Sequence, residues 1–139
     1  MDVSQPATLT QVGLLPMAER VVGIALRGSY AYLANDADGL QILDVGDPAR
    51  PQRVGDHPTF KLATDVVLGE QIAYVTAGNG GLHLFDVSEP VTPTEVGDLP
   101  FAGADAVTAR FPYAYVAGRG GMYVVDAADP ATPTTVATY

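Results

Sequence analysis

The sequence predicts an all-β fold, a segment of a β-propeller built from four-stranded antiparallel blades. Three observations lead to this prediction. The apolar segments show no sustained 3.6-residue period, which argues against amphipathic helices. Ala-Tyr followed by Leu or Val recurs, beginning at Ala31, Ala73 and Ala114. An Asp-x-x-x-Pro element recurs in steps of 42, 42 and 40 residues, at Asp2/Pro6, Asp44/Pro48, Asp86/Pro90 and Asp126/Pro130. A period in the low forties with four strands per unit is typical of propeller blades.

The first complete unit illustrates the four strands expected in each blade. Val22–Leu26 is apolar throughout, and Tyr30–Ala34 is rich in strand-favouring residues. A turn follows in which Gly39 supplies a natural positive-φ position. Leu40–Val45 is the third expected strand, and the more polar Gln52–Gly55 is the fourth, at the outer edge of the blade.

The repeat divides the chain into about three blades and an extra N-terminal strand. Residues 1–15 match the end of a repeat whose beginning is absent, and are expected to form an outer strand. The three complete units then span residues 16–57, 58–99 and 100–139 as one repeat domain. A two-sheet sandwich is the structural rival, but it does not require near-identical blocks at a fixed period.

Three blades are fewer than the four to eight that close a typical propeller. Inner strands that are apolar on both faces need cover on both faces, and an open arc would expose the faces at its ends. The sequence therefore predicts either self-association that closes a ring, for example a homodimer with six blades, or the remaining blades of a longer chain.

Composition excludes several classes of partner and site. The formal net charge of −9 disfavours nucleic acid and anionic lipid surfaces. The apolar runs are too short to insert into a membrane. The absence of cysteine excludes disulfides and thiolate metal sites. The first residues lack the basic and apolar regions of a signal peptide.

Two of the blocks resemble a known repeat. Gly-Leu-Gln-Ile-Leu-Asp-Val from Gly39 and Gly-Leu-His-Leu-Phe-Asp-Val from Gly81 are each followed by Asp/Glu-Pro-x-x-Pro and Val-Gly. These blocks, and the Ala-Tyr-Val strand before them, resemble the LVIVD repeat over nearly the whole chain. The resemblance implies a bacterial or archaeal β-propeller that is often secreted or displayed at the cell surface. It implies no particular activity.

The repeated aspartates and prolines are interpreted as turn residues. A carboxylate entering a turn accepts backbone N–H groups, and proline makes the turn rigid without supplying a strand donor. One copy per blade suits that structural role better than a functional site. The residues concerned are Asp44, Pro48, Asp86, Pro90, Asp126 and Pro130.

Four other aspartates are weak candidates for a cation site. Asp36 and Asp38 resemble the start of a calcium loop, but the later bidentate Glu is missing and the equivalent loops carry no carboxylate. A hairpin turn is therefore the favoured interpretation, and no cofactor is expected. Asp65 and Asp105 stand at the heads of inner strands, where they could bind a cation at the channel or cap the strand.

A binding site is expected in the loops that differ most between the repeats, because binding usually lies in variable loops on a rigid scaffold. These loops span residues 14–21, 56–64 and 98–104. The alternative is that Met17, Phe60 and Phe101 fill the space between blades. The candidate residues for binding an unidentified protein or small molecule are Glu19, Arg20, His57, Phe60, Lys61 and Phe101.

No catalytic constellation is recognisable in the sequence. The two histidines, His57 and His83, have no repeated carboxylate partner, and no Gly-x-Ser-x-Gly motif occurs. The sequence therefore favours a non-catalytic binding or interaction scaffold. Two alternatives stay open: an enzyme or cation-binding module with a site shared across the propeller face, and a truncated or engineered propeller fragment that self-assembles without its own activity.

Overall fold

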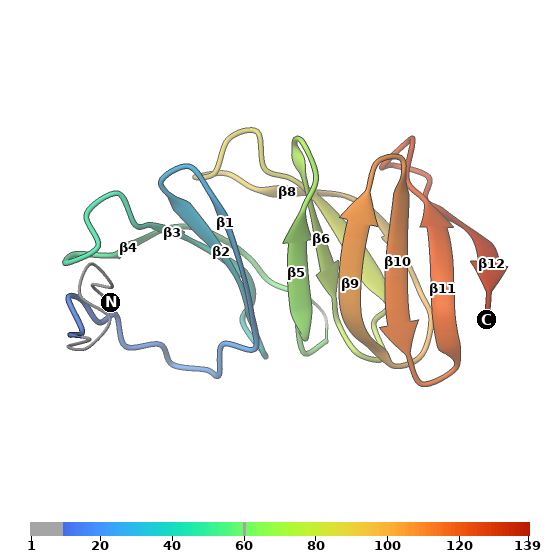
Figure 1. The fold of residues 1–139 in the computed structure, drawn as a ribbon, viewed down its shortest axis with the longest axis horizontal. Helices are drawn as coiled ribbons and strands as arrows, with labels where there is room; N and C mark the ends of the chain where they lie inside the picture. Colours follow the sequence, from blue (N-terminus) through green and yellow to red (C-terminus); the bar gives the residue numbers. More distant parts are fainter. Residues whose placement is uncertain (1–9, 60) are drawn as a thin grey trace.

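A computed structural model describes residues 10–59 and 61–139, and these residues form twelve strands and no helix (Figure 1). Accordingly, the described part of the chain holds no helix long and apolar enough to cross a membrane. Most of the incomplete first repeat, with Asp2 and Pro6, lies outside the described residues, as does Phe60. The strands are β1 (Gly23–Arg27), β2 (Tyr30–Asn35), β3 (Gly39–Asp44), β4 (Gln52–His57), β5 (Asp65–Leu68), β6 (Ile72–Thr76), β7 (Leu82–Asp86), β8 (Thr94–Leu99), β9 (Ala104–Arg110), β10 (Tyr113–Gly118), β11 (Gly121–Asp126) and β12 (Thr134–Thr138).

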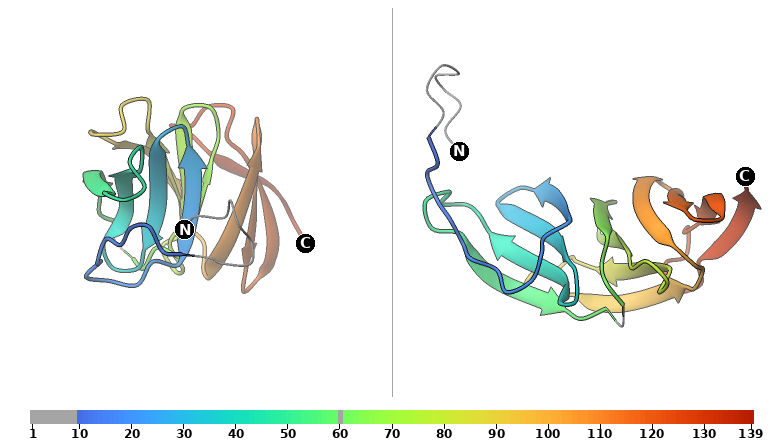
Figure 2. Two further views of the ribbon diagram at one scale, coloured as in Figure 1. Left: turned by 60° about the vertical axis from the view of Figure 1, so that its left-hand side comes forward. Right: turned by 90° about the horizontal axis from the view of Figure 1, so that it is seen from below.

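The strands form three sheets, each of which is an antiparallel meander of four strands in sequence order. We call β1–β4 blade 1, β5–β8 blade 2 and β9–β12 blade 3. Figure 2 shows the blades side by side in an open arc, with β1, β5 and β9 on the concave side and β4, β8 and β12 along the convex side. The prediction of an all-β propeller segment with four-stranded antiparallel blades is confirmed.

The three blades also share an irregularity. The pairing of the third strand with the fourth shifts register between Ile42 and Leu43, and again at the equivalent places in blades 2 and 3. Such a bulge bends the outer strand and increases the local twist. The repeat is therefore preserved in the details of pairing as well as in the order of strands.

The turn aspartates form the same hydrogen bond in every blade. One carboxylate oxygen of Asp44 accepts the N–H of Gly46 at 2.8 Å, and Asp86 accepts that of Ser88 at 2.8 Å. In blade 3, Asp126 accepts the N–H of Ala128 at 2.9 Å. Hydrogen bonding from Ser88 lowers the pKa of Asp86, because it favours the ionised carboxylate.

The hydrophobic core lies between blades. Tyr32 and Leu40 of blade 1 pack with Val66 and Phe85 of blade 2 in one buried cluster. Tyr74, which occupies the position of Tyr32 in the next repeat, packs in a second cluster between blades 2 and 3. Burial raises the pKa of both tyrosine hydroxyls above the ordinary value of 10.0, because desolvation disfavours the phenolate.

Close approach between blades depends on two glycines of the outer strands. A Cβ at Gly55 of β4 would overlap the carbonyl oxygen of Pro90 in the turn of blade 2. A Cβ at Gly97 of β8 would overlap that of Pro130 in blade 3. The Val-Gly that closes each of the first two complete repeats therefore provides the space for the next turn between the third and fourth strands, which we call the Asp-Pro turn.

Candidate functional site

A pocket of about 280 Å³ lies between blades 2 and 3, at the end of the blades where the variable loops gather. The loop before β5, the turn between β6 and β7, and the turn between β10 and β11 all contribute to it. Two residues singled out in the sequence, Lys61 and Asp105, line this pocket together. Arg119, which the sequence analysis did not single out, joins them. The lining residues are Lys61, Leu62, Thr64, Ala77, Gly78, Asn79, Gly103, Asp105 and Arg119.

The rim of this pocket is firmly anchored. Gly78 and Ala104 exchange backbone hydrogen bonds of 3.0 and 2.8 Å between blades 2 and 3. The Thr64 hydroxyl lies 2.8 Å from the carbonyl oxygen of Ala104 and 2.9 Å from the hydroxyl of Thr76. These bonds hold the loop before β5, which carries Lys61, and the start of β9, which carries Asp105. The charged groups themselves, Lys61, Asp105 and Arg119, are solvent-exposed.

Phe60 lies outside the described residues, and the remaining residues proposed for binding lie away from this pocket. Glu19 and Arg20 are exposed on the segment before β1 and do not line the Lys61 pocket. Phe101 does not line it either. Its ring stacks on Tyr123 of blade 3, with centroids 4.6 Å apart and planes inclined by 21°. That contact is the packing role which the sequence analysis left open for this residue.

The histidines both contact the core between blades 1 and 2. The sequence interpretation placed His57 in a loop, but the structure places it at the end of β4, with its ring centroid 5.0 Å from that of Phe85. His83 is buried, and its Nδ1 lies 2.5 Å from a carboxylate oxygen of Glu95 on the neighbouring strand. No feature of the sequence marks Glu95 as this partner.

The carboxylate of Asp65 joins two blades. One oxygen accepts the N–H of Val66 at 2.9 Å, and the other accepts the N–H of Val107 in blade 3 at 3.0 Å. Of the two roles considered for Asp65, this geometry is that of a strand cap. Asp105, in contrast, is exposed at the start of β9.

Asp36 and Asp38 lie in the turn between β2 and β3. Asp36 adopts a positive φ of 39°, as Gly39 does at 79°. One carboxylate oxygen of Asp38 accepts hydrogen bonds from the buried amides of Asn35 at 3.2 Å and Gln41 at 3.0 Å. Within residues 10–59 and 61–139, no group of three or more His, Cys, Asp or Glu side chains is arranged to hold a metal ion.

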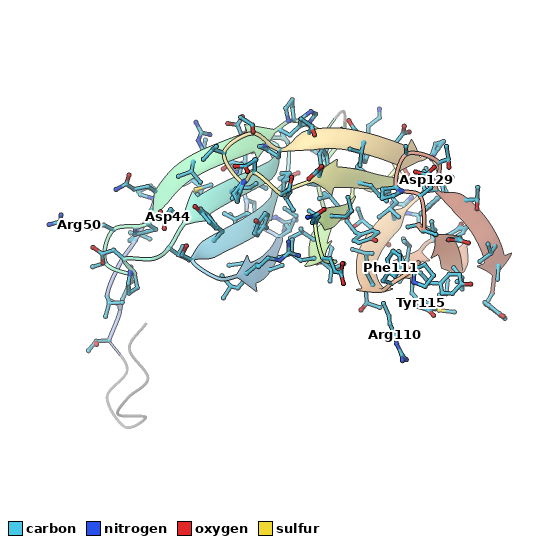
Figure 3. The ribbon with its side chains drawn as sticks, turned by 90° about the horizontal axis from the view of Figure 1, so that it is seen from above. Asp44, Arg50, Arg110, Phe111, Tyr115 and Asp129 are labelled. Carbon is cyan, nitrogen blue, oxygen red and sulfur yellow. The ribbon has the colours of Figure 1, made fainter. Side chains whose placement is uncertain are left out.

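A second pocket, of about 210 Å³, lies at the opposite end of the same two blades. It lies between the turn that joins β5 to β6 and the turn that joins β9 to β10. Glu70 and Tyr74 contribute to it from blade 2, and Phe111 contributes from blade 3 with 72% of its surface exposed. Figure 3 shows Phe111 on blade 3 near Arg110 and Tyr115. An aromatic residue in a tight turn was the available sequence signal for this pocket.

Comparison with known proteins identifies the fold and the family. No curated protein matches the sequence. The computationally designed Ika4 protein is similar in structure, with a TM-score of 0.74 and 13% identity over 95% of this chain and 79% of that one. The designed Ika8 protein is similar with a TM-score of 0.69 and 13% identity over 86% of this chain. The match spans only 36% of the Ika8 chain. The family model of the LVIVD repeat matches residues 20–59, 62–99 and 104–139, and the chain therefore belongs to the LVIVD repeat family.

Proposed function

We propose that the chain is a non-catalytic binding scaffold, and that its ligand site is the pocket lined by Lys61, Asp105 and Arg119. The observation that carries the proposal is the convergence of two cations in one pocket of a chain whose net charge is −9. Lys61 is the only lysine, and it comes from a loop that differs between repeats. Arg119 comes from a different blade. Such convergence of polar groups from separate loops is typical of ligand pockets.

The charges of this pocket suit a small molecule with a carboxylate or phosphate group. An arginine guanidinium can donate two parallel hydrogen bonds to either anion, and a lysine ammonium adds a point charge beside it. Asp105 would disfavour a ligand that carries several negative charges, and would favour one with an amino or hydroxyl group at its side. The volume of about 280 Å³ limits the ligand to a few heavy atoms beyond the anion.

The test is titration calorimetry with two probes that each carry an amino group beside the anion, β-alanine for the carboxylate and O-phosphoethanolamine for the phosphate. We expect Lys61→Ala and Arg119→Ala each to weaken binding of the preferred probe about tenfold or more, since each removes a charge-assisted hydrogen bond. Arg50→Ala is the matched control, because Arg50 is exposed on the Asp-Pro turn of blade 1, away from this pocket (Figure 3). Equal binding by all variants would overturn the site. Turnover of a substrate that was lost in His57→Ala would overturn the non-catalytic role.

A further inference from the structure

We define the forward face of a blade as the face toward the next blade in the chain, and the rear face as the opposite one. Each interface within the arc joins the forward face of one blade to the rear face of the next. Tyr32 and Leu40 lie on the forward face of blade 1, and Tyr74 and Leu82 occupy the same positions in blade 2. All four are at most 3% exposed. The repeat therefore builds the same apolar forward face in successive blades.

Blade 3 carries this forward face without a partner inside the described part of the chain. Tyr115 occupies the position of Tyr32 and Tyr74, and Met122 that of Leu40 and Leu82. Met122 is 41% exposed, and the two side chains line a shallow depression of about 240 Å³ with Ala106, Thr108 and Ala117. Nothing in this lining is charged. The face is built like those that are buried between blades.

Blade 1 carries the complementary rear face, which is open at its inner strand β1, whereas Leu15 and Met17 cover the part formed by β2 and β3. Val66 of blade 2 and Val107 of blade 3 lie on rear faces and are 4% and 9% exposed. Ile24 occupies the same position in blade 1 and is 63% exposed, and its neighbour Leu26 is 67% exposed. The two ends of the arc are thus the two halves of the interface that the chain already forms twice.

The segment before blade 1 imitates the outer strand of a preceding blade. A Cβ at Gly13 would overlap the carbonyl oxygen of Pro48, as one at Gly55 would overlap that of Pro90. Leu15 packs on the cluster that contains Leu43, just as His57 packs on Phe85, the residue equivalent to Leu43. Residues 10–15 therefore occupy the place that β4 and β8 take against the blades that follow them.

The outer strand of blade 3 differs from the other two at the position where they carry Gly55 and Gly97. Ile42 pairs with Gly55 and Leu84 pairs with Gly97, but Val124 pairs with Ala137. If a further blade packed on blade 3 in the same manner, its proline carbonyl would meet the methyl group of Ala137. If that blade were blade 1 of a second copy, the position against its Pro48 carbonyl would already be filled by Gly13 of the second copy. Ala137 and the second Gly13 cannot both occupy it.

We propose that a second copy of this chain covers both end faces, and that residues 10–15 of each copy replace β12 as the outer strand of the other copy's blade 3. Two copies of these three blades contain six, which falls within the usual four to eight. The same contacts on both sides give a closed twofold assembly, which leaves no apolar blade face in water. Exchange of an identical element between protomers is a recognised route to such dimers.

The experiment uses the fact that the 139-residue chain contains no cysteine. Tyr123 pairs with Thr138 of β12, as Gln41 pairs with Asp56 and His83 with Asp98. The residue equivalent to Asp56 in the N-terminal segment is Leu14, which is 74% exposed. Two double variants therefore share one substitution, Tyr123→Cys/Leu14→Cys and Tyr123→Cys/Thr138→Cys. Facing positions of this kind allow a disulfide.

We expect the Leu14→Cys/Tyr123→Cys variant to form a covalent dimer on mild oxidation. Once the protein is concentrated enough for sedimentation to show a dimer, the yield of covalent dimer should not rise further with concentration. The Tyr123→Cys/Thr138→Cys variant should stay largely reduced. A dimer in which this second variant forms its disulfide within each chain would overturn the strand exchange alone. A monomeric wild-type chain would overturn the second copy as the occupant of the end faces. The single variant Tyr123→Cys, followed by circular dichroism, shows that the shared substitution preserves the fold.

Discussion

At the scale of single residues, carboxylates hold the backbone of this protein in shape. Asp86 accepts the Ser88 N–H within one turn, and Asp65 accepts the Val107 N–H across two blades. Both contacts satisfy backbone donors, one in a turn and the other on β9, which is an edge strand of blade 3. The repeated aspartate is therefore explained by local hydrogen bonding without any ligand.

The Asp86 carboxylate should make the protein less stable in acid. The pKa of Asp86 is lowered in the folded state, so its contribution to stability is present above the ordinary value of 3.8 and is lost as pH falls through the lowered pKa. We expect Asp86→Ala to reduce the free energy of unfolding at pH 7 by about 0.5 kcal/mol, the low end for a hydrogen bond near solvent. Urea unfolding at pH 7 and pH 3 measures this. A difference between wild type and variant that grew at pH 3 would contradict the assignment.

Residue roles could be predicted where the repeat and the local turn chemistry agree. The aspartate before each Asp-Pro turn and the positive φ of Gly39 follow from spacing alone. The pairing of His83 with Glu95 does not, because it depends on the register of β7 with β8 and on the bulge between Leu84 and Phe85. A bulge shifts which side chains face each other, and it leaves no clear mark in a single sequence.

At the scale of elements, the outer strands join the blades. β4 belongs to blade 1 by its hydrogen bonds, and its Gly55 also receives the Asp-Pro turn of blade 2. The same arrangement recurs where Gly97 of β8 meets blade 3. Each outer strand therefore helps to set the position of the next blade, in addition to the packing of the apolar faces.

Because of this role, we expect a methyl group to destabilise the protein at Gly97 but not at Ala137, the equivalent position of the last blade. Gly97→Ala should lower the free energy of unfolding by about 1–3 kcal/mol, as overpacking does in a fixed interface, because the new methyl group overlaps the Pro130 carbonyl. Ala137→Gly is the matched control at the equivalent position of β12, and should change stability by less than about 1 kcal/mol. Thermal unfolding of both variants decides. Equal losses would show that backbone entropy, and not the contact between blades, governs the position.

The number, order and approximate limits of the strands could be predicted from the sequence, because the same strand pattern recurs in each repeat. The strand end at His57 and the pocket at Arg119 could not. Arg119 lies in a glycine-rich turn that is not among the loops varying most in length, and only the packing of blade 3 on blade 2 brings it beside Lys61. Contacts between neighbouring repeats depend on the curvature of the arc, which the repeat period does not specify.

At the scale of the whole molecule, the arc leaves two apolar faces open at its ends. Ile24 and Leu26 lie on one of these faces, and Tyr115 and Met122 lie on the other. Burying apolar area stabilises a protein by about 25 cal/mol per Å². The same residue positions are buried twice within the chain, so the end faces have the shape and chemistry for a third interface of the same kind.

A chain stabilised by a second copy should melt at a temperature that depends on its concentration, since association by mass action favours the folded dimer. A tenfold increase in concentration is worth about 1.4 kcal/mol, which for two chains of this size predicts a rise in Tm of about 2 °C. Met122→Asp places a charge on the forward face of blade 3, and should lower Tm and remove its dependence on concentration. Val91→Asp is the matched control, because Val91 is 55% exposed on the turn of blade 2, which is on neither end face. Scanning calorimetry over a hundredfold range of concentration gives the result. A wild-type Tm that stayed constant over that range would mean that the end faces are not covered by a second copy.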